Sequence, residues 1–430
     1  MLTRKFCLAA LLSCTFAWGA DLNLPNDEFQ TQARALTRQQ IPDLTALAAA
    51  GDARAQCVLG IAYANGFAVP PDPAEAAQWL RRAADQHLGR AANDLGYLYQ
   101  HGEGVPQSDT EAVKWYQRAA EVNNTKGETN LGFMYSKGLG VKQDFAQALK
   151  WYRRAAAQGF PAAQFNLASF YRDGKGVRQD YVEAANLLRP LAEDGYEVAQ
   201  RELAVLYQNG LGVSRNKKEA LRWYRSAAEQ GDAAAQETLG YQYFTGGLGQ
   251  KDLDEAAQWT RAAAQQGVAQ AESNLGYLYE RGAGVPHDPQ QAANWYKSAA
   301  AQGNVIAEVS LAQLYYFGEG VPRDYEQALK WYRQAAEQGN GSAAKNLGYI
   351  YANGRGARLD YEEAYNWFRR AMVGGDKASK HELAKLRHIM TSRQVQEAEF
   401  RWSAQHSSLP SSAPVNPPRE ALQPEPSEHP

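Results

Sequence analysis

The residues best suited to catalysis or metal binding are scattered through the chain. The 430-residue sequence contains seven histidines and three cysteines, and only His381 and His388, seven residues apart, would share one helix face. No cysteine or carboxylate completes a convincing metal-ligand set with them. The sequence also lacks a His-Glu-x-x-His, a Gly-x-Ser-x-Gly and a phosphate-loop motif. We therefore expect no metal site, no bound cofactor and no catalytic residue.

One short match to an enzyme motif needs a separate explanation. Ser214-Arg215-Asn216-Lys217 fits the Ser-x-x-Lys pattern of penicillin-binding enzymes and β-lactamases. However, Asn216 stands where a helix N-cap is expected, and no Lys-Thr-Gly motif accompanies the match. We expect that the protein is not an enzyme, and a cell-wall-directed enzyme of this type is the alternative.

The elements that position all of these residues follow a repeat of 36 residues. A leucine followed by a small residue recurs at this interval without insertion or deletion, at Leu59, Leu95, Leu131, Leu167, Leu203, Leu239, Leu275, Leu311, Leu347 and Leu383. A tyrosine stands four residues after each of the first nine leucines. A tryptophan stands twenty residues after them, except at Leu187. Such a period indicates a stack of identical supersecondary units.

Each repeat is expected to hold two helices. The first carries the leucine, the small residue and the tyrosine on one side, and it ends at a Gly-x-Gly turn such as residues 102–104. The second begins with Asp, Asn or Ser, and a Glu or Gln follows three residues later, as in Asp72 and Glu75. This spacing predicts a reciprocal capping box in all nine repeats. We expect the leucine, the small residue, the tyrosine and the tryptophan to form the packing between helices.

This set of motifs resembles the Sel1-like repeat family, which is related to the tetratricopeptide repeats. The matching motifs are Leu-Gly-x-x-Tyr, Gly-x-Gly-Val, the capping Asp, Ala-x-x-Trp-Tyr and Ala-Ala-x-Gln-Gly, and residues 331–339 show the signature nearly complete. The resemblance covers about residues 41–390. It implies an all-α fold, a right-handed α/α superhelical solenoid of about nine 36-residue helix-turn-helix repeats with terminal capping helices. The cysteine pairs of the family members linked to β-lactamase activity are missing here.

The two ends of the chain differ from the repeats. Residues 1–20 combine Arg4 and Lys5 with a short apolar run and small residues, which predicts a signal peptide, or alternatively a lipid anchor at Cys14. We expect a capping helix region at 21–51, nine repeats at 52–375, a C-terminal helix and cap at 376–404, and a disordered Pro/Ser-rich tail at 405–430. The protein should be a periplasmic or secreted monomer, with an outer-membrane lipoprotein as the alternative.

The candidate binding surface lies on the first helices, because in the Sel1-like and tetratricopeptide families these line the concave face. Positions −5, −1, 2 and 6, counted from the leucine, point away from the packing side. The expected partner-binding residues are Asn130, Asn166, Asn274, Asn346, Tyr97, Phe133, Tyr241, Tyr277, Tyr349, Arg54, Arg90 and Lys126. Asn can bond a peptide backbone, and Tyr supplies contact area. The alternative is that these side chains pack between adjacent first helices.

Charge and motifs together favour a holding function. The net charge of −2 gives no general attraction to nucleic acid or to an anionic membrane. The three cations Arg54, Arg90 and Lys126 would make the N-terminal third of the groove more positive. We therefore expect an exported bacterial scaffold or adaptor that binds a protein or peptide of the envelope or of a host. A peptidoglycan- or glycan-binding module is a further alternative.

Overall fold

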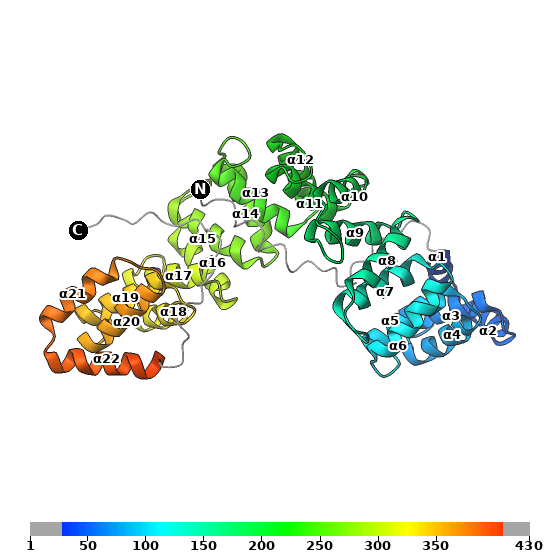
Figure 1. The fold of residues 1–430 in the computed structure, drawn as a ribbon, viewed down its shortest axis with the longest axis horizontal. Coiled ribbons are helices and arrows are strands. Elements are labelled where there is room, and N and C mark those ends of the chain that lie inside the picture. The colour runs from blue at the N-terminus through cyan, green and yellow to red at the C-terminus, as the bar shows by residue number, and fades with distance from the viewer. Residues whose placement is uncertain (1–27, 407–430) are drawn as a thin grey trace. The chain divides into compact units, whose positions relative to one another are not determined.

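The protein is all-α in the part that the structure describes. The computed structural model describes residues 28–406, which form 22 α-helices and one short 3-10 helix without any β-strand (Figure 1). These residues belong to two compact units, the first ending at Asn216 and the second beginning at Lys217. Within residues 28–406, no helix is both long enough and apolar enough to span a membrane. The expected signal peptide, the lipidation at Cys14 and nearly all of the expected tail lie outside the described residues.

Unit 1 begins with short helices and continues with helices of 12 or 13 residues, each packed on the next. It consists of α1 (Glu28–Arg34), η2 (Arg38–Gln40), α2 (Ile41–Ala49), α3 (Ala53–Asn65), α4 (Pro73–Asp85), α5 (Gly89–His101), α6 (Asp109–Glu121), α7 (Thr125–Lys137), α8 (Phe145–Ala156), α9 (Pro161–Asp173), α10 (Tyr181–Glu193) and α11 (Glu197–Asn209). Adjacent first helices also touch, as α5 and α7 do.

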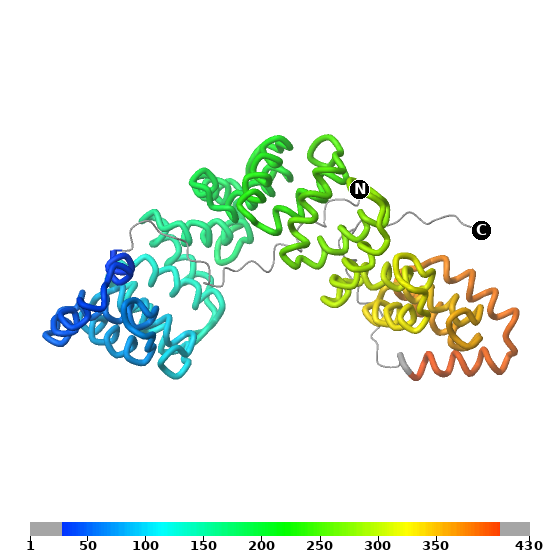
Figure 2. Tube along the Cα trace, turned by 180° about the vertical axis from the view of Figure 1, so that it is seen from behind, coloured from blue at the N-terminus to red at the C-terminus, as the bar shows by residue number. Residues whose placement is uncertain are grey.

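Unit 2 repeats the same arrangement and ends differently (Figure 2). It consists of α12 (Lys217–Glu229), α13 (Ala233–Thr245), α14 (Leu253–Gln265), α15 (Ala269–Arg281), α16 (Pro289–Ala301), α17 (Val305–Phe317), α18 (Tyr325–Glu337), α19 (Gly341–Asn353), α20 (Tyr361–Val373), α21 (Ser379–Ile389) and α22 (Ser392–His406). Both α21 and α22 pack on α20. Arg387, at the place of the missing repeat tyrosine, donates to Tyr365 Oη and to Glu399 there. The expected solenoid of helix pairs is confirmed in both units.

Only one of the two hydrogen bonds of the predicted capping box forms at the helix N-termini. The Asp72 carboxylate accepts from the backbone N–H groups of Ala74 and Glu75, at 3.1 and 3.0 Å. The second half of the prediction is wrong, because the Asp72 N–H donates to the Tyr63 carbonyl at 2.9 Å. The Glu75 carboxylate instead accepts from Trp79 Nε1. The turn brings an unpaired carbonyl of the first helix to the cap, and this N–H to tyrosine carbonyl bond recurs in all nine repeats.

The Gly-x-Gly turns bring consecutive repeats into backbone contact. Gly102 ends α5 with φ of 72°, and Gly104 has φ of 70°. A Cβ on Gly104 would lie 2.1 Å from the backbone carbon of Pro73 in the preceding repeat. Only glycine allows this approach together with the left-handed conformation. The recurrence of the turn is therefore a packing requirement of the solenoid.

The core contains one position that the sequence reasoning missed. The leucines of the nine repeats are buried as expected, and so are the residues that follow the repeat tryptophans, among them Tyr116, Tyr152, Tyr296 and Phe368. Tyr116 explains the small residue after the leucine, because a Cβ on Gly96 would lie 2.7 Å from its ring. This core position could have been recognised in the sequence, because Leu, Tyr, Thr or Phe directly follows the tryptophan position of every repeat.

Candidate partner-binding surface

The asparagines that precede the repeat leucines lie mostly inside the solenoid. Asn130 is 6% exposed, and its Nδ2 donates to Asn93 Oδ1 at 2.9 Å, which links α7 to α5. Asn274 is 5% exposed and accepts from Gln270 Nε2 at 3.0 Å. Asn166 and Asn346 are half-buried. Asn130 therefore follows the alternative of packing between adjacent first helices, and Asn274 is occupied on its own helix.

The residues two positions after the repeat leucines form a partly exposed row, which we call the aromatic row. Tyr97, Phe133, Tyr241, Tyr277 and Tyr349 belong to it, and all are half-buried or exposed. The row also contains half-buried residues without aromatic rings, namely Ser169, Val205 and Gln313, whereas Ile61 at the same position of the first repeat is buried. These positions offer surface to a partner that the buried asparagines do not.

Local contacts hold the rings of the aromatic row. The Tyr97 ring stacks on His101 with centroids 4.1 Å apart. The Tyr349 ring meets Phe368 edge to face at 5.2 Å and is still 38% exposed. Partial burial raises the pKa of both phenols, and nearby carboxylates add to it, Glu103 for Tyr97 and Glu382 for Tyr349. Both hydroxyls therefore stay protonated at neutral pH and can donate hydrogen bonds.

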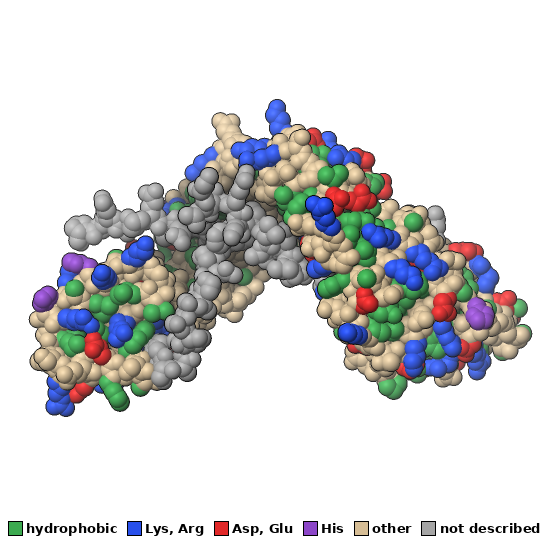
Figure 3. Space-filling view, in the orientation of Figure 1, with side chains coloured by type: hydrophobic (Ala, Val, Ile, Leu, Met, Phe, Trp, Pro, Cys, Tyr) green, Lys and Arg blue, Asp and Glu red, His purple; other side chains and the backbone are tan. Residues whose placement is uncertain are grey.

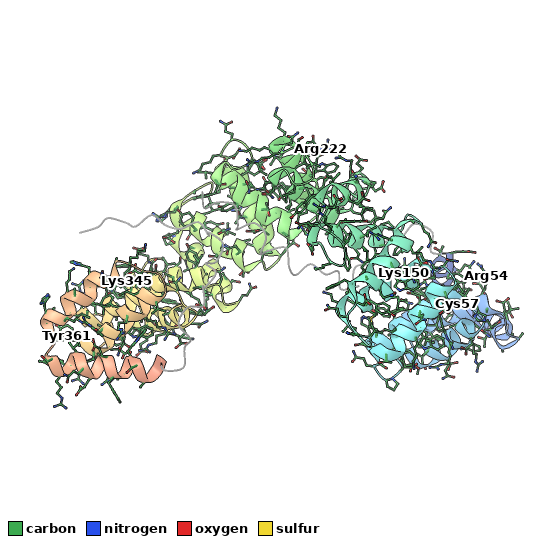
Figure 4. All side chains as sticks on the ribbon, viewed as in Figure 1. Arg54, Cys57, Lys150, Arg222, Lys345 and Tyr361 are labelled. Carbon is green, nitrogen blue, oxygen red and sulfur yellow. The ribbon has the colours of Figure 1, made fainter. Side chains whose placement is uncertain are left out.

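Acidic neighbours offset the positive charge expected in the N-terminal third. Arg54, labelled on α3 in Figure 4, pairs with Glu28 at 2.5 Å. Arg90 pairs with Asp94 at 2.6 Å, and Lys126 is half-buried. Basic and acidic side chains are intermingled on the face of unit 1 seen in Figure 3. Because each pair joins opposite charges, these pairs produce no long-range positive field in the N-terminal third of the chain.

Unit 2 adds cations that sequence reasoning did not select. Lys251 Nζ lies 4.9 Å from the centroid of the Phe244 ring, and that ring meets Tyr277 edge to face at 5.9 Å. The Arg281 guanidinium lies over the other ring of this pair, 5.6 Å from the Tyr277 centroid. Among residues 28–406, no carboxylate forms an ion pair with Lys251 or Arg281. In the sequence, the pair of Phe244 and Lys251 could have been recognised as an aromatic residue five positions after the repeat leucine, followed by a cation seven residues later.

The structure does not bring together the residues that the sequence offered as candidates for catalysis or metal binding. His381 and His388 are both exposed on α21, and Ser214 is exposed in the turn before α12. In the described part of the chain, no group of three His, Cys, Asp or Glu side chains could hold a metal ion. Cys57 on α3 is buried, and burial raises the pKa of its thiol well above the usual range. A thiol in this environment is a packing group rather than a nucleophile.

Comparisons with known proteins agree with this architecture. The Sel1 repeat model matches nine segments, at 53–88, 89–124, 125–160, 161–196, 198–232, 233–268, 269–304, 305–340 and 341–371. One similar structure is c5321, a protective antigen of uropathogenic Escherichia coli with an SLR fold, at 33% identity, TM-score 0.72, and coverage of 89% of this chain and 85% of that one. Another is a Sel1 repeat protein from Oxalobacter formigenes, at 31% identity, TM-score 0.60, and coverage of 76% and 95%. No curated protein matches the chain. The chain therefore belongs to the Sel1 repeat family, a family of protein-interaction repeats.

Proposed function

We propose that this protein is an exported bacterial scaffold or adaptor that binds an extended segment of a protein partner along the part of the aromatic row that lies in unit 2. One observation carries the proposal: the repeats keep large aromatic rings partly exposed where a packing position would be buried, as at Tyr277 and Tyr349. Tyrosine is enriched at energetically important interface positions because it buries a large area and keeps a polar tip. The partner is a protein of the bacterial envelope or of a host.

Binding to glycans through tryptophan has less support. Half of the repeat tryptophans, Trp79, Trp115, Trp223 and Trp259, are at most 9% exposed, and the other half are half-buried between the helices. A sugar could stack only on rings that are open to solvent. The aromatic row offers mainly tyrosines, whose hydroxyls suit a peptide backbone as hydrogen-bond partners.

Affinity capture from envelope extract and from host-cell extract tests the proposal. The wild-type protein is compared with Tyr277→Ala/Tyr349→Ala, which truncates two rings of the aromatic row. We expect the double variant to lose at least about tenfold of the recovered partner, since each truncation of an interface tyrosine costs on the order of 1 kcal/mol or more. Phe400→Ala is the matched control, because Phe400 is 74% exposed on α22 and lies outside the row. Equal recovery by the wild type and the double variant would reject the row as the binding surface.

Export is a separate part of the proposal. It rests on the signal-peptide pattern of residues 1–20, and the description of the Escherichia coli relative as a protective antigen supports it. Cell fractionation followed by mass spectrometry of the mature N-terminus separates the outcomes. Cleavage after Gly19 indicates a periplasmic or secreted protein, an acylated Cys14 indicates a lipoprotein, and an uncleaved chain in the cytoplasm contradicts export.

A further inference from the structure

An aromatic cluster on unit 2 combines one exposed ring with two half-buried rings that also pack within the repeats. It consists of Tyr316 and Phe317 at the end of α17 and Tyr325 at the start of α18, which we call the aromatic triad. The Tyr316 ring meets both others edge to face, with centroids 5.1 Å from Phe317 and 5.3 Å from Tyr325. Phe317 is 62% exposed. Single exposed apolar side chains are common, but here the exposed ring continues through Tyr316 to a third ring, and the three together form a patch.

Arginines border the triad. The Arg323 guanidinium lies 5.9 Å from the Tyr325 centroid, and the Arg355 charge counteracts the rise that burial causes in the pKa of Tyr316. No carboxylate among residues 28–406 forms an ion pair with either arginine. The adjacent Asp324 carboxylate is already occupied, because it accepts from two backbone N–H groups as the cap of α18.

Comparison with other repeats shows that Arg323 has been released from a structural contact. At the equivalent position, the side chains of Gln107, Gln143, Gln179, Arg215 and His287 contact a carbonyl in the last turn of the first helix. Arg323 instead lies beside Tyr325, where its Nη1 donates to Oη at 3.5 Å and its guanidinium is 5.9 Å from the ring centroid. The repeat has thus exchanged a helix-end contact for a cation beside exposed aromatic rings. This combination suits a ligand with proline rings and carboxylates, since proline-rich segments dock on aromatic-lined surfaces.

The chain itself contains such a ligand after α22. Residues 407–430 include seven prolines, three glutamates and one arginine, and the stretch Gln-Pro-Glu-Pro-Ser-Glu covers 423–428. A polyproline II segment has three residues per turn, so Glu425 and Glu428 would share one edge about 9 Å apart. Pro424 and Pro426 would present flat rings beside that edge.

The length of chain is sufficient for contact within one molecule. Glu425 follows His406 by nineteen residue steps, and an extended proline-rich chain of this length reaches about 60 Å. α22 packs on α20, α20 on α19, and α19 on α18. Packed helices lie about 8–10 Å apart, so three such steps amount to about 30 Å at most.

We propose that residues 423–428 dock on the aromatic triad of the same chain, with proline rings on Tyr316, Phe317 and Tyr325 and with Glu425 and Glu428 paired to Arg323 and Arg355. This contact occurs without any partner protein, and it covers an aromatic surface that would otherwise be open to association. Occupation by the tail of a second copy, or by a proline-rich segment of another protein, is a distinct outcome of the test.

Photo-crosslinking in the full-length protein tests the contact directly. Benzoylphenylalanine replaces Phe317, and the irradiated protein is digested and mapped by mass spectrometry. We expect crosslinks to residues 420–430 in a product that migrates as a monomer. The matched control places the same group at Val182, which is 55% exposed on α10, and should give no tail crosslink. Absence of tail crosslinks from position 317, equal yields from both positions, or crosslinks only between two copies would each overturn the proposal.

A charge exchange tests the pairing of glutamates with arginines. In the position-317 background, Glu425→Arg/Glu428→Arg should lower the crosslink yield about tenfold, as expected for the loss of two partly exposed ion pairs and their replacement by repulsion. Adding Arg323→Glu/Arg355→Glu should restore the yield. A yield that the tail substitutions leave unchanged, or that the exchange does not restore, would contradict the proposed pairing. Circular dichroism of each variant checks that the helices are intact.

Discussion

The two units share one repeat frame but use the polar residues of their first helices differently. In unit 1 these residues satisfy one another: Arg172 bonds Asp173 at 2.8 Å and Glu202 at 2.5 Å, and Lys175 bonds Asp173 at 2.7 Å. In unit 2 the corresponding surface holds aromatic rings with cations, as in Lys251 over Phe244. These cations of unit 1 are held in ion pairs, whereas Lys251 and Arg281 of unit 2 form no ion pair among residues 28–406.

This difference shows what the repeat does and does not constrain. The frame depends on backbone contacts and on small residues at fixed positions, which are the same in both units. The outer positions of the first helices contribute little to these contacts, so they are free to carry either ion pairs or aromatic rings. A regular period is therefore evidence about the scaffold, while the departures from regularity indicate where a partner binds.

The largest expected effect tests whether the frame is the same in both units. Gly104→Ala and Gly320→Ala each place a Cβ at about 2 Å from a proline backbone, 2.1 Å from Pro73 and 2.2 Å from Pro289. We expect each to lower the free energy of unfolding by about 4 kcal/mol, because left-handed strain adds to a backbone overlap. Urea unfolding followed by circular dichroism measures the loss.

Controls for these glycines separate strain from overlap. Gly159 and Gly303 have φ of 77° and 80°, and a Cβ on either would meet nothing within 4 Å. Their alanine variants should lose only about 1–2 kcal/mol, the cost of the left-handed conformation. If Gly104→Ala and Gly320→Ala differ strongly from each other, the two units do not share one frame.

The second prediction concerns the internal pairing of unit 1. Arg172→Ala removes a side chain that is 13% exposed and leaves the Glu202 carboxylate, 5% exposed, with Arg201 at 3.7 Å as a weaker partner. We expect a loss of about 2 kcal/mol, because a nearly buried carboxylate loses its close ion pair. Thermal and urea unfolding measure it. Arg54→Ala, which removes an exposed ion pair, should cost at most about 0.5 kcal/mol, and equal effects of the two variants would refute the pairing argument.

The frame could be predicted from the sequence because each of its requirements allows very few residue types. Only glycine fits where Gly104 combines positive φ with contact to the preceding repeat, and Asp is among the few residue types that cap a helix well, as at Asp72. Such requirements leave a column of identical or similar residues. The order of helices, their ends and the solenoid follow from those columns.

The surface could not be predicted in the same way. Counting positions around one helix gives the direction of a side chain but not the location of the neighbouring helix. Asn130 was expected to face a partner, yet the adjacent α5 covers it and Asn93 bonds it. The second bond of the capping box was wrongly predicted for a related reason. The Asp72 N–H donates to the Tyr63 carbonyl, and the Glu75 carboxylate accepts from the Trp79 indole. Contacts made across helices leave no signature in the spacing of one helix.

The third prediction uses a position that both units fill with a buried carboxylate. Glu308 in unit 2 is fully buried and accepts from the amides of Gln334 and Gln338, without a cation. Burial raises the pKa of its carboxyl above the ordinary value, although the two amide hydrogen bonds counteract the rise. The carboxyl group therefore contributes stability at pH values below the ordinary pKa of glutamate, and this contribution is lost as the pH rises through the raised pKa.

Glu308→Gln should stabilise the protein by about 1 kcal/mol at pH 8, because Gln200 and Gln236 at the same position each donate to an alanine carbonyl of the preceding helix. The gain should shrink as the pH falls below about 5. Urea unfolding at several pH values measures it. The matched Glu128→Gln variant in unit 1 should show no gain, since it loses the Arg154 pair at 2.7 Å. Equal gains in both variants would contradict the role assigned to that cation.

The smallest effect on stability is the one that sharpens the comparison most. Lys251→Ala and Arg281→Ala should each change the free energy of unfolding by about 0.5 kcal/mol or less, because both cations lie at the surface on half-buried rings and have no ion pair among the described residues. Removing a side chain that serves binding should change the free energy of unfolding little and should weaken the complex with the partner strongly. The double variant should therefore unfold like the wild type and recover less partner in affinity capture. If it loses as much stability as Arg172→Ala, these cations are structural, and the difference between the two units is one of composition only.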